Sequence, residues 1–301
     1  MRLAYLGTPE MSVPPLLALH EAGHDIALVE TRADARRGRG GRTGPSPVKQ
    51  AALDLGLRVS HDMADLVDAG AELGVVVAYG RIIPGAVLAA LRMVNLHFSL
   101  LPRWRGAAPV ERAILAGDDV TGVCVMDVEE GLDTGAVYAR AEVPIGSETT
   151  ADELRRELVD LGTRLLVDRL AAGLGEPEPQ HGDVTYAHKI SPDERRLDWR
   201  RPAVELHRVV RVGNAFTTFR GERFKLHAAD RTAAPGATAP GELVGDVITA
   251  GDGQALRPVQ VQQAGSPRMS WQSFANGARP ADGERFGDEA AEADNDDTVG
   301  R

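Results

Sequence analysis

An unbroken apolar run, Leu73 to Ala78 (LGVVVA), restricts this chain to a small group of folds. Its valines favour a strand, and a strand with no alternation of apolar and polar positions is buried on both faces. Strands of that kind occur in parallel sheets covered by helices on both sides. The run therefore predicts an α/β fold, with the residues after it at the carboxyl edge of the sheet, where ligands bind.

The N-terminus supports the same prediction. Leu3 to Leu6 is expected to be a strand, Met11 to Ala22 a helix and Ile26 to Val29 a second strand. This βαβ order indicates a Rossmann-like parallel sheet. The turn after Gly7 lacks the second and third glycines of the dinucleotide-binding fingerprint, so NAD is disfavoured and the turn is expected to lie near the substrate.

A polar pair follows on the next predicted strand, Met93 to Phe98. Asn95 and His97 alternate with apolar residues, so their side chains lie on one side of the strand, two positions apart. Pro102 and Gly106 then interrupt regular structure, which places the pair at the end of a strand.

These residue types indicate a particular chemistry. The Asn95 amide can donate to a developing oxyanion, and His97 can move a proton near neutral pH. Asp133, in the turn GLDTG, could orient the imidazole or accept its proton. With no clear nucleophile among them, the three suit acyl transfer from a bound donor to an amine. Ser99 is a conceivable nucleophile, but its position is more typical of a backbone cap or a donor-binding group.

Spacing alone leaves a second interpretation open, in which Asn95 and His97 are ordinary polar residues at a strand end. The longer motif is more specific. The stretch NLHFSLLPRWRGAAP, followed by GLDTG, resembles the signature of the 10-formyltetrahydrofolate-dependent formyltransferases. Its PRWRGAAP part is similar to the form found in members that act on initiator methionyl-tRNA. Further similar segments occur in the same order, namely LAYLGTP, PSPVK, VAYG and TYAHK.

The resemblance implies a mechanism and a donor. The formyl group of 10-formyltetrahydrofolate would pass to the α-amine of methionine on initiator tRNA. Asn95 would hold the oxyanion, while His97, aligned by Asp133, would move protons. Two loops would border the folate donor, comprising Tyr79, Gly80, Arg81 and Ile82, and Ser99, Leu100, Leu101 and Pro102.

The segment from Thr31 to Pro47 is rich in Arg and Gly and has no hydrophobic period. Such composition is typical of a solvated, disordered linker, but it also suits a flexible arm that becomes ordered on a phosphate backbone. The resemblance favours the arm, because the family carries a basic insertion here that reaches the tRNA acceptor stem. The tRNA-binding residues expected on this basis are Arg36, Arg37, Arg39, Arg42 and Lys49.

The C-terminal third predicts a small β-barrel, because short candidate strands alternate with Gly and Pro turns. These strands are Thr217 to Phe219, Arg223 to Leu226, Gly241 to Ile248 and Val259 to Gln262, and Met269 to Phe274 would close the barrel. The resemblance implies a formyltransferase domain over 1–178 and an OB-like tRNA-contacting domain over 203–284. Between them we expect a linker over 179–202, and after them an acidic, disordered tail over 285–301.

Composition limits the remaining possibilities. The net charge of −10 is unusual for an RNA-binding protein, but the basic residues gather in the Arg-rich segment and the acidic excess in the tail. The single cysteine, Cys124, lies in an apolar run and fits a small buried hydrophobe in a reducing cytoplasm. Neither a signal peptide, a membrane span nor a metal-binding Cys/His cluster is expected. The resemblance suggests a monomer.

Three alternative functions are also compatible with the sequence. The same donor could serve an amino-sugar nucleotide or glycinamide-ribotide acceptor, although a small acceptor needs neither a basic arm nor a second domain. The same three residues could hydrolyse the formyl-folate, with water in place of the amine. A non-catalytic RNA-binding module is the third possibility, and it leaves Asn95, His97 and Asp133 without a purpose.

Overall fold

The computed structural model of the chain describes residues 1–37, 42–236 and 238–287. The chain forms two compact units. Unit 1 comprises Met1–Ala113, Asp118–Ser147 and Asp152–Lys189, and unit 2 comprises Ile114–Gly117, Glu148–Ala151 and the residues from Ile190 onward. The limits predicted for catalytic domain, linker and C-terminal domain remain predictions. The tail predicted from residue 285 onward begins too early, because Arg285 and Phe286 form backbone bridges and Phe286 is buried. The rest of the predicted tail, from residue 288, lies outside the described residues.

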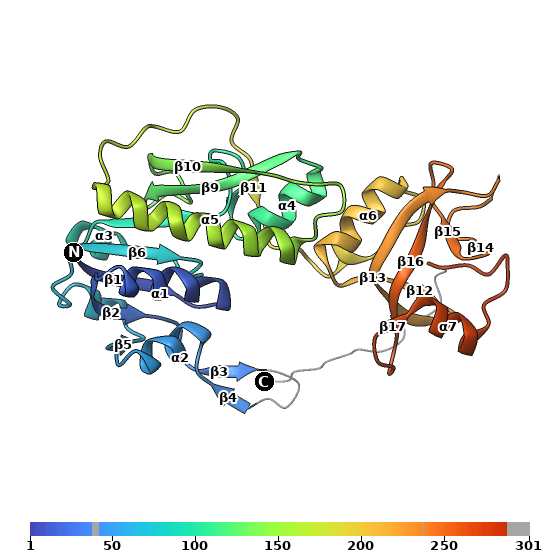
Figure 1. Cartoon of the computed structure of the whole chain (residues 1–301), viewed down its shortest axis with the longest axis horizontal. Helices are drawn as coiled ribbons and strands as arrows, with labels where there is room; N and C mark the ends of the chain where they lie inside the picture. Colours follow the sequence, from blue (N-terminus) through green and yellow to red (C-terminus); the bar gives the residue numbers. More distant parts are fainter. Residues whose placement is uncertain (38–41, 237, 288–301) are drawn as a thin grey trace. The chain divides into compact units, whose positions relative to one another are not determined.

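Unit 1 is built on a seven-stranded sheet in the order β10-β9-β7-β6-β1-β2-β5 (Figure 1). The five strands from β7 to β5 run parallel, and β9 and β10 extend the sheet antiparallel. Every residue of the central strand β6 is buried, as expected for a strand covered on both faces. The predicted Rossmann-like parallel sheet is thus confirmed. The strand bounds are β1 Arg2–Gly7, β2 Asp25–Glu30, β5 Val59–Ser60, β6 Leu73–Val77, β7 Met93–His97, β9 Val120–Asp127 and β10 Val137–Pro144.

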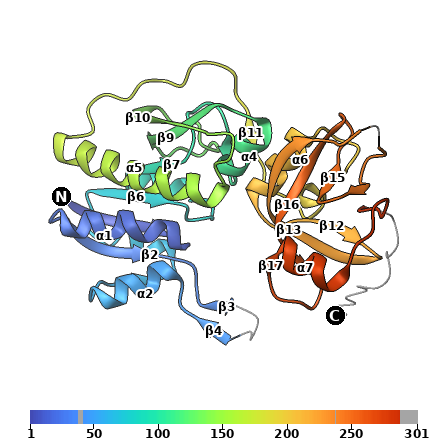
Figure 2. The same ribbon diagram turned by 45° about the vertical axis from the view of Figure 1, so that its right-hand side comes forward.

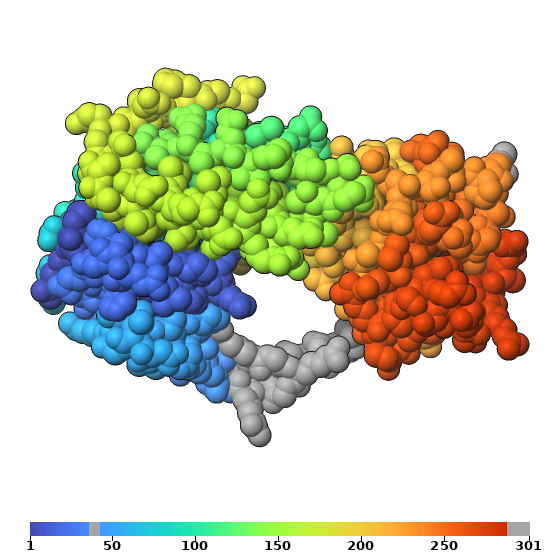
Figure 3. All heavy atoms as spheres, in the orientation of Figure 1, coloured from blue at the N-terminus to red at the C-terminus, as the bar shows by residue number. Residues whose placement is uncertain are grey.

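Two helices, α1 (Val13–Glu21) and α5 (Ala151–Ala172), cover one face of this sheet, and their atoms close over it in the space-filling view (Figures 1, 2 and 3). A methyl group at Gly162 of α5 would lie 3.1 Å from the Leu96 side chain, so α5 packs directly on β7. The other helical segments of unit 1 are η1 Glu10–Ser12, α2 Pro47–Asp54, η2 Met63–Leu66 and α3 Gly85–Ala90. Helix α4, Pro109–Ala116, begins in unit 1, and its residues from Ile114 belong to unit 2.

The Arg-rich segment was predicted to lack regular structure, and this prediction is wrong for its ends. Strands β3 (Ala35–Arg37) and β4 (Arg42–Gly44) form a short antiparallel hairpin. Backbone pairing needs no hydrophobic period, so periodicity could not reveal it. Below the hairpin, the Thr31 and Ser46 hydroxyls lie 2.7 Å apart, and Ser46 caps α2 by accepting the Lys49 N–H.

Unit 2 is a curled antiparallel sheet, a half-barrel, with strand order β12-β13-β16-β15-β14 and β17 paired to β16 (Figure 2). The small β-barrel predicted for this part is confirmed as a half-barrel. Its elements are η3 Asp193–Arg195, α6 Ala203–Val212, β12 Ala215–Phe219, β13 Glu222–Ala233, β14 Leu243–Val244, β15 Val247–Thr249, β16 Gln254–Gln263, β17 Met269–Ser270 and α7 Trp271–Ala278.

Several bounds in unit 2 differ from the prediction. β13 and β16 are longer than expected because they pair along nearly their whole length, which satisfies the backbone despite polar side chains. The expected strand Gly241 to Ile248 is two strands of a hairpin. The expected closing element, Met269 to Phe274, consists of the short strand β17 and the start of helix α7, which begins there because the Ser270 hydroxyl caps it by accepting the Ser273 N–H.

An aromatic cluster forms the core of unit 2. Phe219 stacks on Phe286 with ring centroids 4.5 Å apart, and Phe224 lies 4.8 Å from Phe274. Trp199, from the polar segment before α6, is buried in the same cluster. Large rings supply much apolar area from few residues, which explains how a protein low in aromatic residues can still build this core. Within the described residues, every helix is too short or too polar to span a bilayer.

Candidate active site

Strand β7 positions the polar pair as predicted. Leu96 faces α5, so its neighbours Asn95 and His97 point away from that helix. His97 is buried, whereas Asn95 is only half-buried. Among the described residues, no hydrogen bond holds the Asn95 side chain. The amide is therefore available to a ligand.

The His97 ring lies between two acceptors. Nε2 is 3.0 Å from the carbonyl oxygen of Trp104, and Nδ1 is 3.6 Å from Oδ2 of Asp133. Because a carbonyl only accepts, Nε2 must carry a proton. Nδ1 is then the nitrogen that gains or loses a proton, and it faces the carboxylate. A separation of 3.6 Å is slightly too long for a direct hydrogen bond, so a small movement would make or break the contact.

Asp133 reaches this position from the loop between β9 and β10. Its Oδ2 accepts the Gly106 N–H at 2.7 Å, which fixes the carboxylate beside the strand segment β8 (Arg105–Gly106). Its backbone has a φ of +50°, which non-glycine residues rarely adopt. In unit 1, the described non-glycine residues with positive φ are Ala78, Trp104 and Asp133. All three belong to the loops around this site, as is common at functional centres.

Trp104 is held from several sides. Its indole Nε1 donates to Asp118 at 2.7 Å, and its backbone N–H donates to the Thr185 hydroxyl at 2.8 Å. Arg103 forms a two-pronged ion pair with the same Asp118. These contacts aim the Trp104 carbonyl at His97. Ser99 is fully buried and donates to the Arg103 carbonyl at 2.6 Å, so it is a backbone cap and not a nucleophile.

The predicted donor loop, Tyr79 to Ile82, follows β6 through a turn in which Ala78 and Gly80 have positive φ. The Thr8 hydroxyl donates to the Tyr79 carbonyl at 3.1 Å, so the turn after β1 supports this loop. The Tyr79 hydroxyl donates to Glu30 at 2.8 Å, and Arg81 lies 3.6 Å from the same carboxylate. Burial raises the pKa of Glu30, and the hydrogen bond from Tyr79 opposes this shift.

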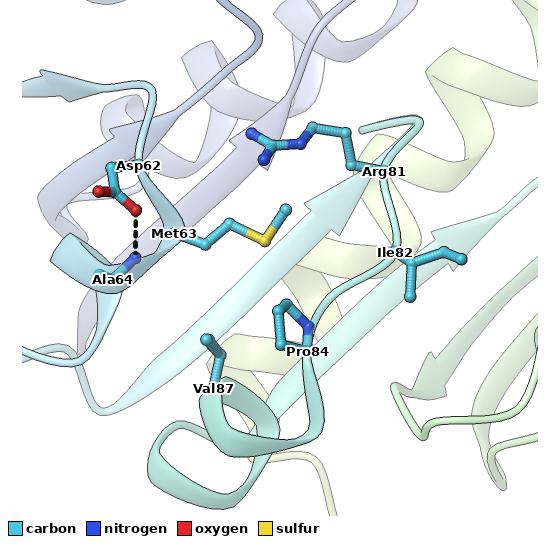
Figure 4. A pocket seen from close by; sticks show the side chains of 7 residues that line it. All are labelled: Asp62, Met63, Ala64, Arg81, Ile82, Pro84 and Val87. Carbon is cyan, nitrogen blue, oxygen red and sulfur yellow. Dashed lines mark hydrogen bonds between the residues drawn. The ribbon is translucent and has the colours of Figure 1, made fainter.

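A hollow of about 620 Å³ opens beside the loop (Figure 4). Arg81 and Ile82 line it together with Asp62, Met63, Ala64, Pro84 and Val87. Ile82 is 88% exposed, an unusual state for a large apolar side chain. Asn95, His97 and Asp133 are not part of this lining. In the second predicted donor segment, Leu101 and Pro102 are buried and Leu100 is half-buried.

The loop that carries Asp133 also approaches the donor loop. A methyl group at Gly85, the first residue of α3, would lie 2.3 Å from Oε1 of Glu130. The start of α3 therefore lies beside the end of the Glu130 side chain, in the loop after β9. The two loops predicted to serve the reaction are adjacent in the fold.

The expected tRNA-binding residues fall into three groups. Arg36, Arg37 and Arg42 lie on the β3–β4 hairpin, and Arg39 lies outside the described residues. Lys49, on α2, forms an ion pair with Asp34 at 2.7 Å and lies 3.3 Å from His61 Nε2. The described residues contain no group of acids, histidines and cysteines arranged to hold a metal ion.

Three supporting residues were missed by the sequence analysis. They are Glu30 behind the donor loop, Asp118 behind Trp104 and Gln180, which contacts the Asp133 loop. None belongs to a recognisable motif, because each acts on residues far away in the sequence.

Comparison with known proteins gives the family. The formyl transferase model matches residues 1–170, and the model of the formyl transferase C-terminal domain matches residues 189–279. A methionyl-tRNA formyltransferase of Ruegeria pomeroyi is 44% identical over 295 residues, covering 92% of this chain and 97% of the relative. One from Dinoroseobacter shibae is 47% identical over 283 residues, covering 88% and 93%.

The chain belongs to the methionyl-tRNA formyltransferase family. The family predicted from the signature stretch is confirmed, and so is the enzyme class, a formyltransferase. The non-catalytic RNA-binding alternative is thereby set aside.

Solved structures agree on the fold. An N-formyltransferase from Helicobacter canadensis, in complex with folinic acid and dTDP-3-aminofucose, superposes with a TM-score of 0.64 at 17% identity, covering 87% of this chain and 98% of that one. A methionyl-tRNA formyltransferase from Clostridium thermocellum gives 0.55 at 15% identity, covering 76% and 93%. At identities of 17% and 15%, these two structures show only that the fold is shared.

Proposed function

We propose that this protein transfers the formyl group of 10-formyltetrahydrofolate to the α-amine of methionine esterified to initiator tRNA. The arrangement of Asn95, His97 and Asp133 supports this proposal most directly. An available amide donor stands two residues from an imidazole that faces a carboxylate, and acyl transfer to an amine needs these groups.

The geometry supports the following proposed residue roles. The amine attacks the formyl carbon, and the Asn95 amide donates to the oxyanion of the tetrahedral intermediate. The amine loses a proton to the Nδ1 edge of His97, beside Asp133, and the proton moves on to the departing folate nitrogen. His97 Nε2 takes no part in this transfer, because it donates to the Trp104 carbonyl. Asp133 orients the ring and stabilises its charged form.

The folate would occupy the edge formed by Tyr79 to Ile82 and Ser99 to Pro102. The hollow is lined mainly by apolar side chains, together with Arg81 and Asp62. Apolar walls with a nearby guanidinium suit an aromatic ligand whose carboxylate tail pairs with Arg81. The Arg81 side chain is 42% exposed and can turn toward such a tail. Because Ser99 is fully buried, its segment would meet the donor through backbone groups.

The acceptor tRNA would be held by the basic segment around the β3–β4 hairpin. Arg36, Arg37, Arg39 and Arg42 supply guanidinium groups for phosphates. Lys49 would contribute less directly, because it is already paired with Asp34. The reaction belongs to protein synthesis, so we place the protein in the cytoplasm, and we propose that it acts as a monomer.

The test is formyl transfer measured with labelled 10-formyltetrahydrofolate and methionyl-initiator tRNA, beside a dTDP-linked amino sugar as the control acceptor. Asn95→Ala should lower kcat by about 10²- to 10³-fold, as expected for the loss of one oxyanion donor. His97→Ala should lower it at least as far, while donor binding measured by fluorescence stays close to that of the wild type.

Formylation of the amino sugar but not of the tRNA would overturn the proposed acceptor. Full activity in both variants would overturn the residue roles. Release of formate without an acceptor would indicate a hydrolase that uses the same three residues.

A further inference from the structure

Gln180 lies in a stretch without regular structure after α5, yet it contacts the loop that carries Asp133. The two residues are 47 positions apart. The half-buried side chain is outside the signature stretch and outside the loop after β9. Its hydrogen bonds nevertheless connect the signature stretch to the loop after β9.

The Gln180 amide uses all of its hydrogen-bonding capacity. Nε2 donates to the carbonyls of Asp133 and Gly135, each at 2.8 Å. Oε1 accepts from Arg105, with Nε at 3.1 Å and Nη2 at 2.7 Å. A primary amide has two N–H donors and two acceptor lone pairs, so every position is occupied. Such complete satisfaction makes the side chain a rigid connector.

Through its Nε2 atom, Gln180 holds a strained turn. Asp133 has a φ of +50°, and a conformation of this kind costs about 1–3 kcal/mol and persists only when surrounding contacts impose it. At Gly135 the chain passes so close to β9 that an added methyl group would lie 2.0 Å from the Asp127 carbonyl. The two bonds from Gln180 hold the backbone on both sides of this turn.

Through its Oε1 atom, Gln180 holds Arg105, which precedes the residue that binds the Asp133 carboxylate. Arg105 is followed by Gly106, whose N–H donates to Asp133 Oδ2 at 2.7 Å. Gln180 therefore links the Asp133 backbone to Arg105 of β8, the strand segment whose Gly106 also holds the Asp133 carboxylate. Because His97 Nδ1 stands 3.6 Å from that carboxylate, a shift of a few tenths of an ångström decides whether the two share a proton.

We propose that Gln180 is a positioning residue, which sets the Asp133 carboxylate at the distance from His97 that the transfer requires. This inference rests on the proposed function, in which Asp133 assists proton movement. The hydrogen bonds of Gln180 go to Arg105, Asp133 and Gly135, and not to Asn95 or His97. It acts through Asp133 alone.

Two variants separate its donors from its acceptors. Gln180→Ala removes all four bonds, while Gln180→Glu keeps lone pairs for Arg105 but loses the N–H groups that hold the Asp133 and Gly135 carbonyls. Both should lower kcat about ten- to a hundredfold, the scale expected when a catalytic group is misplaced by up to about 1 Å. KM for donor and tRNA should change less than threefold. The matched control is Gln272→Ala, which removes one exposed hydrogen bond to Asn276 on α7 and should leave kcat unchanged.

A double-mutant cycle tests directly whether Gln180 acts through Asp133. If Gln180 acts through Asp133, adding Gln180→Ala to Asp133→Asn should lower kcat by less than a further threefold, because the group being positioned has already lost its charge. A purely structural role would multiply the two losses. If the losses in kcat multiply in the double variant, the inference is overturned. A wild-type kcat in a Gln180 single variant would overturn it as well.

Thermal unfolding distinguishes a failed fold from a failed site. The kcat of each variant is measured at least 15 °C below its own Tm, so that loss of folded protein cannot imitate loss of positioning. Failure of the proposed function looks different, because the wild type itself would then not formylate methionyl-tRNA. The inference alone fails if wild-type transfer is intact and Asp133→Asn is impaired, but Gln180→Ala is not.

Discussion

At the scale of single residues, Trp104 serves the candidate site through its backbone carbonyl. That carbonyl accepts a hydrogen bond from the His97 Nε2–H, so the other ring nitrogen, Nδ1, is the one that faces Asp133. The residue has a φ of +63°, which is unfavourable for a bulky side chain. Its indole is anchored by Asp118 at 2.7 Å, and Arg103 stacks over the ring with its guanidinium carbon 4.5 Å from the centroid.

Replacing Asp118 by Ala should therefore disturb catalysis although Asp118 contacts no reacting group. We expect kcat to fall about tenfold, because the Trp104 carbonyl and the His97 ring lose their fixed orientation. Steady-state formyl transfer measures this effect. Asp119→Ala is the control, since its exposed neighbouring carboxylate has no part in the Trp104 anchor. Equal kcat in the two variants would argue against the anchor.

Glu30 provides a second prediction at this scale. Its carboxylate is fully buried, and burial raises its pKa above the ordinary value of 4.5. The folded protein therefore holds this proton more tightly than the unfolded chain does. As pH rises above about 4.5 the unfolded chain releases the proton first, so this group lowers the free energy of unfolding until the pH passes the raised folded value.

Glu30→Gln should become more stable relative to the wild type as the pH rises from 4.5 toward neutrality. The difference can change by at most about 1.4 kcal/mol per pH unit, the limit for one proton. Urea unfolding at a series of pH values gives the comparison. The exposed Glu157→Gln serves as the control and should show no such trend. A pH-independent difference for Glu30→Gln would contradict the assignment.

At the scale of elements, strand β7 serves two purposes because its side chains alternate. Leu96 packs against α5, and Asn95 and His97 face the site. The β3–β4 hairpin is different, because Ala35 and Thr43, one on each of its strands, are exposed. The hydroxyls of Thr31 and Ser46, 2.7 Å apart and both buried, fasten its base.

The charge of that hairpin leads to a prediction about salt. The triple variant Arg36→Gln, Arg37→Gln, Arg42→Gln should raise KM for tRNA at least tenfold at about 0.15 M salt and leave kcat nearly unchanged. The slope of log KM against log salt should become shallower by about 1 for each phosphate that an arginine no longer neutralises. The control, Arg156→Gln with Arg164→Gln on α5, should leave that slope unaltered. An unchanged slope in the triple variant would place the tRNA elsewhere.

At the scale of the whole molecule, each unit has a core of its own. Unit 1 buries aliphatic side chains around β6, and unit 2 buries the aromatic cluster of Phe219, Phe224, Phe274 and Phe286. A separate core is the condition for a unit to unfold on its own.

Calorimetry should therefore resolve two unfolding transitions. Folinic acid at about 100 times its Kd should stabilise the unit 1 transition by about 2.7 kcal/mol and leave the other in place. Phe224→Ala should lower the unit 2 transition by about 3–5 kcal/mol and leave folinic acid binding intact. One transition that moves under both treatments would show instead that the units unfold together.

The amino-acid sequence by itself determined the class of fold and pointed to the residues that we propose as the reacting groups. The β6 run specified a doubly covered strand, because burial on both faces leaves no polar position. The alternation in β7 specified that Asn95 and His97 share a face. These signals are local, since the strand period and the residue types are both contained in a few neighbouring positions.

Only the tertiary structure decided how those groups are held. The bonds from Tyr79 to Glu30, from Trp104 to Asp118 and from Gln180 to Asp133 span 49, 14 and 47 residues. The β3–β4 pairing and the helix after Ser270 were likewise not read from the pattern. A hydrogen bond between distant residues depends on distances and angles that exist only after the sheet has assembled, and no spacing along the chain encodes them.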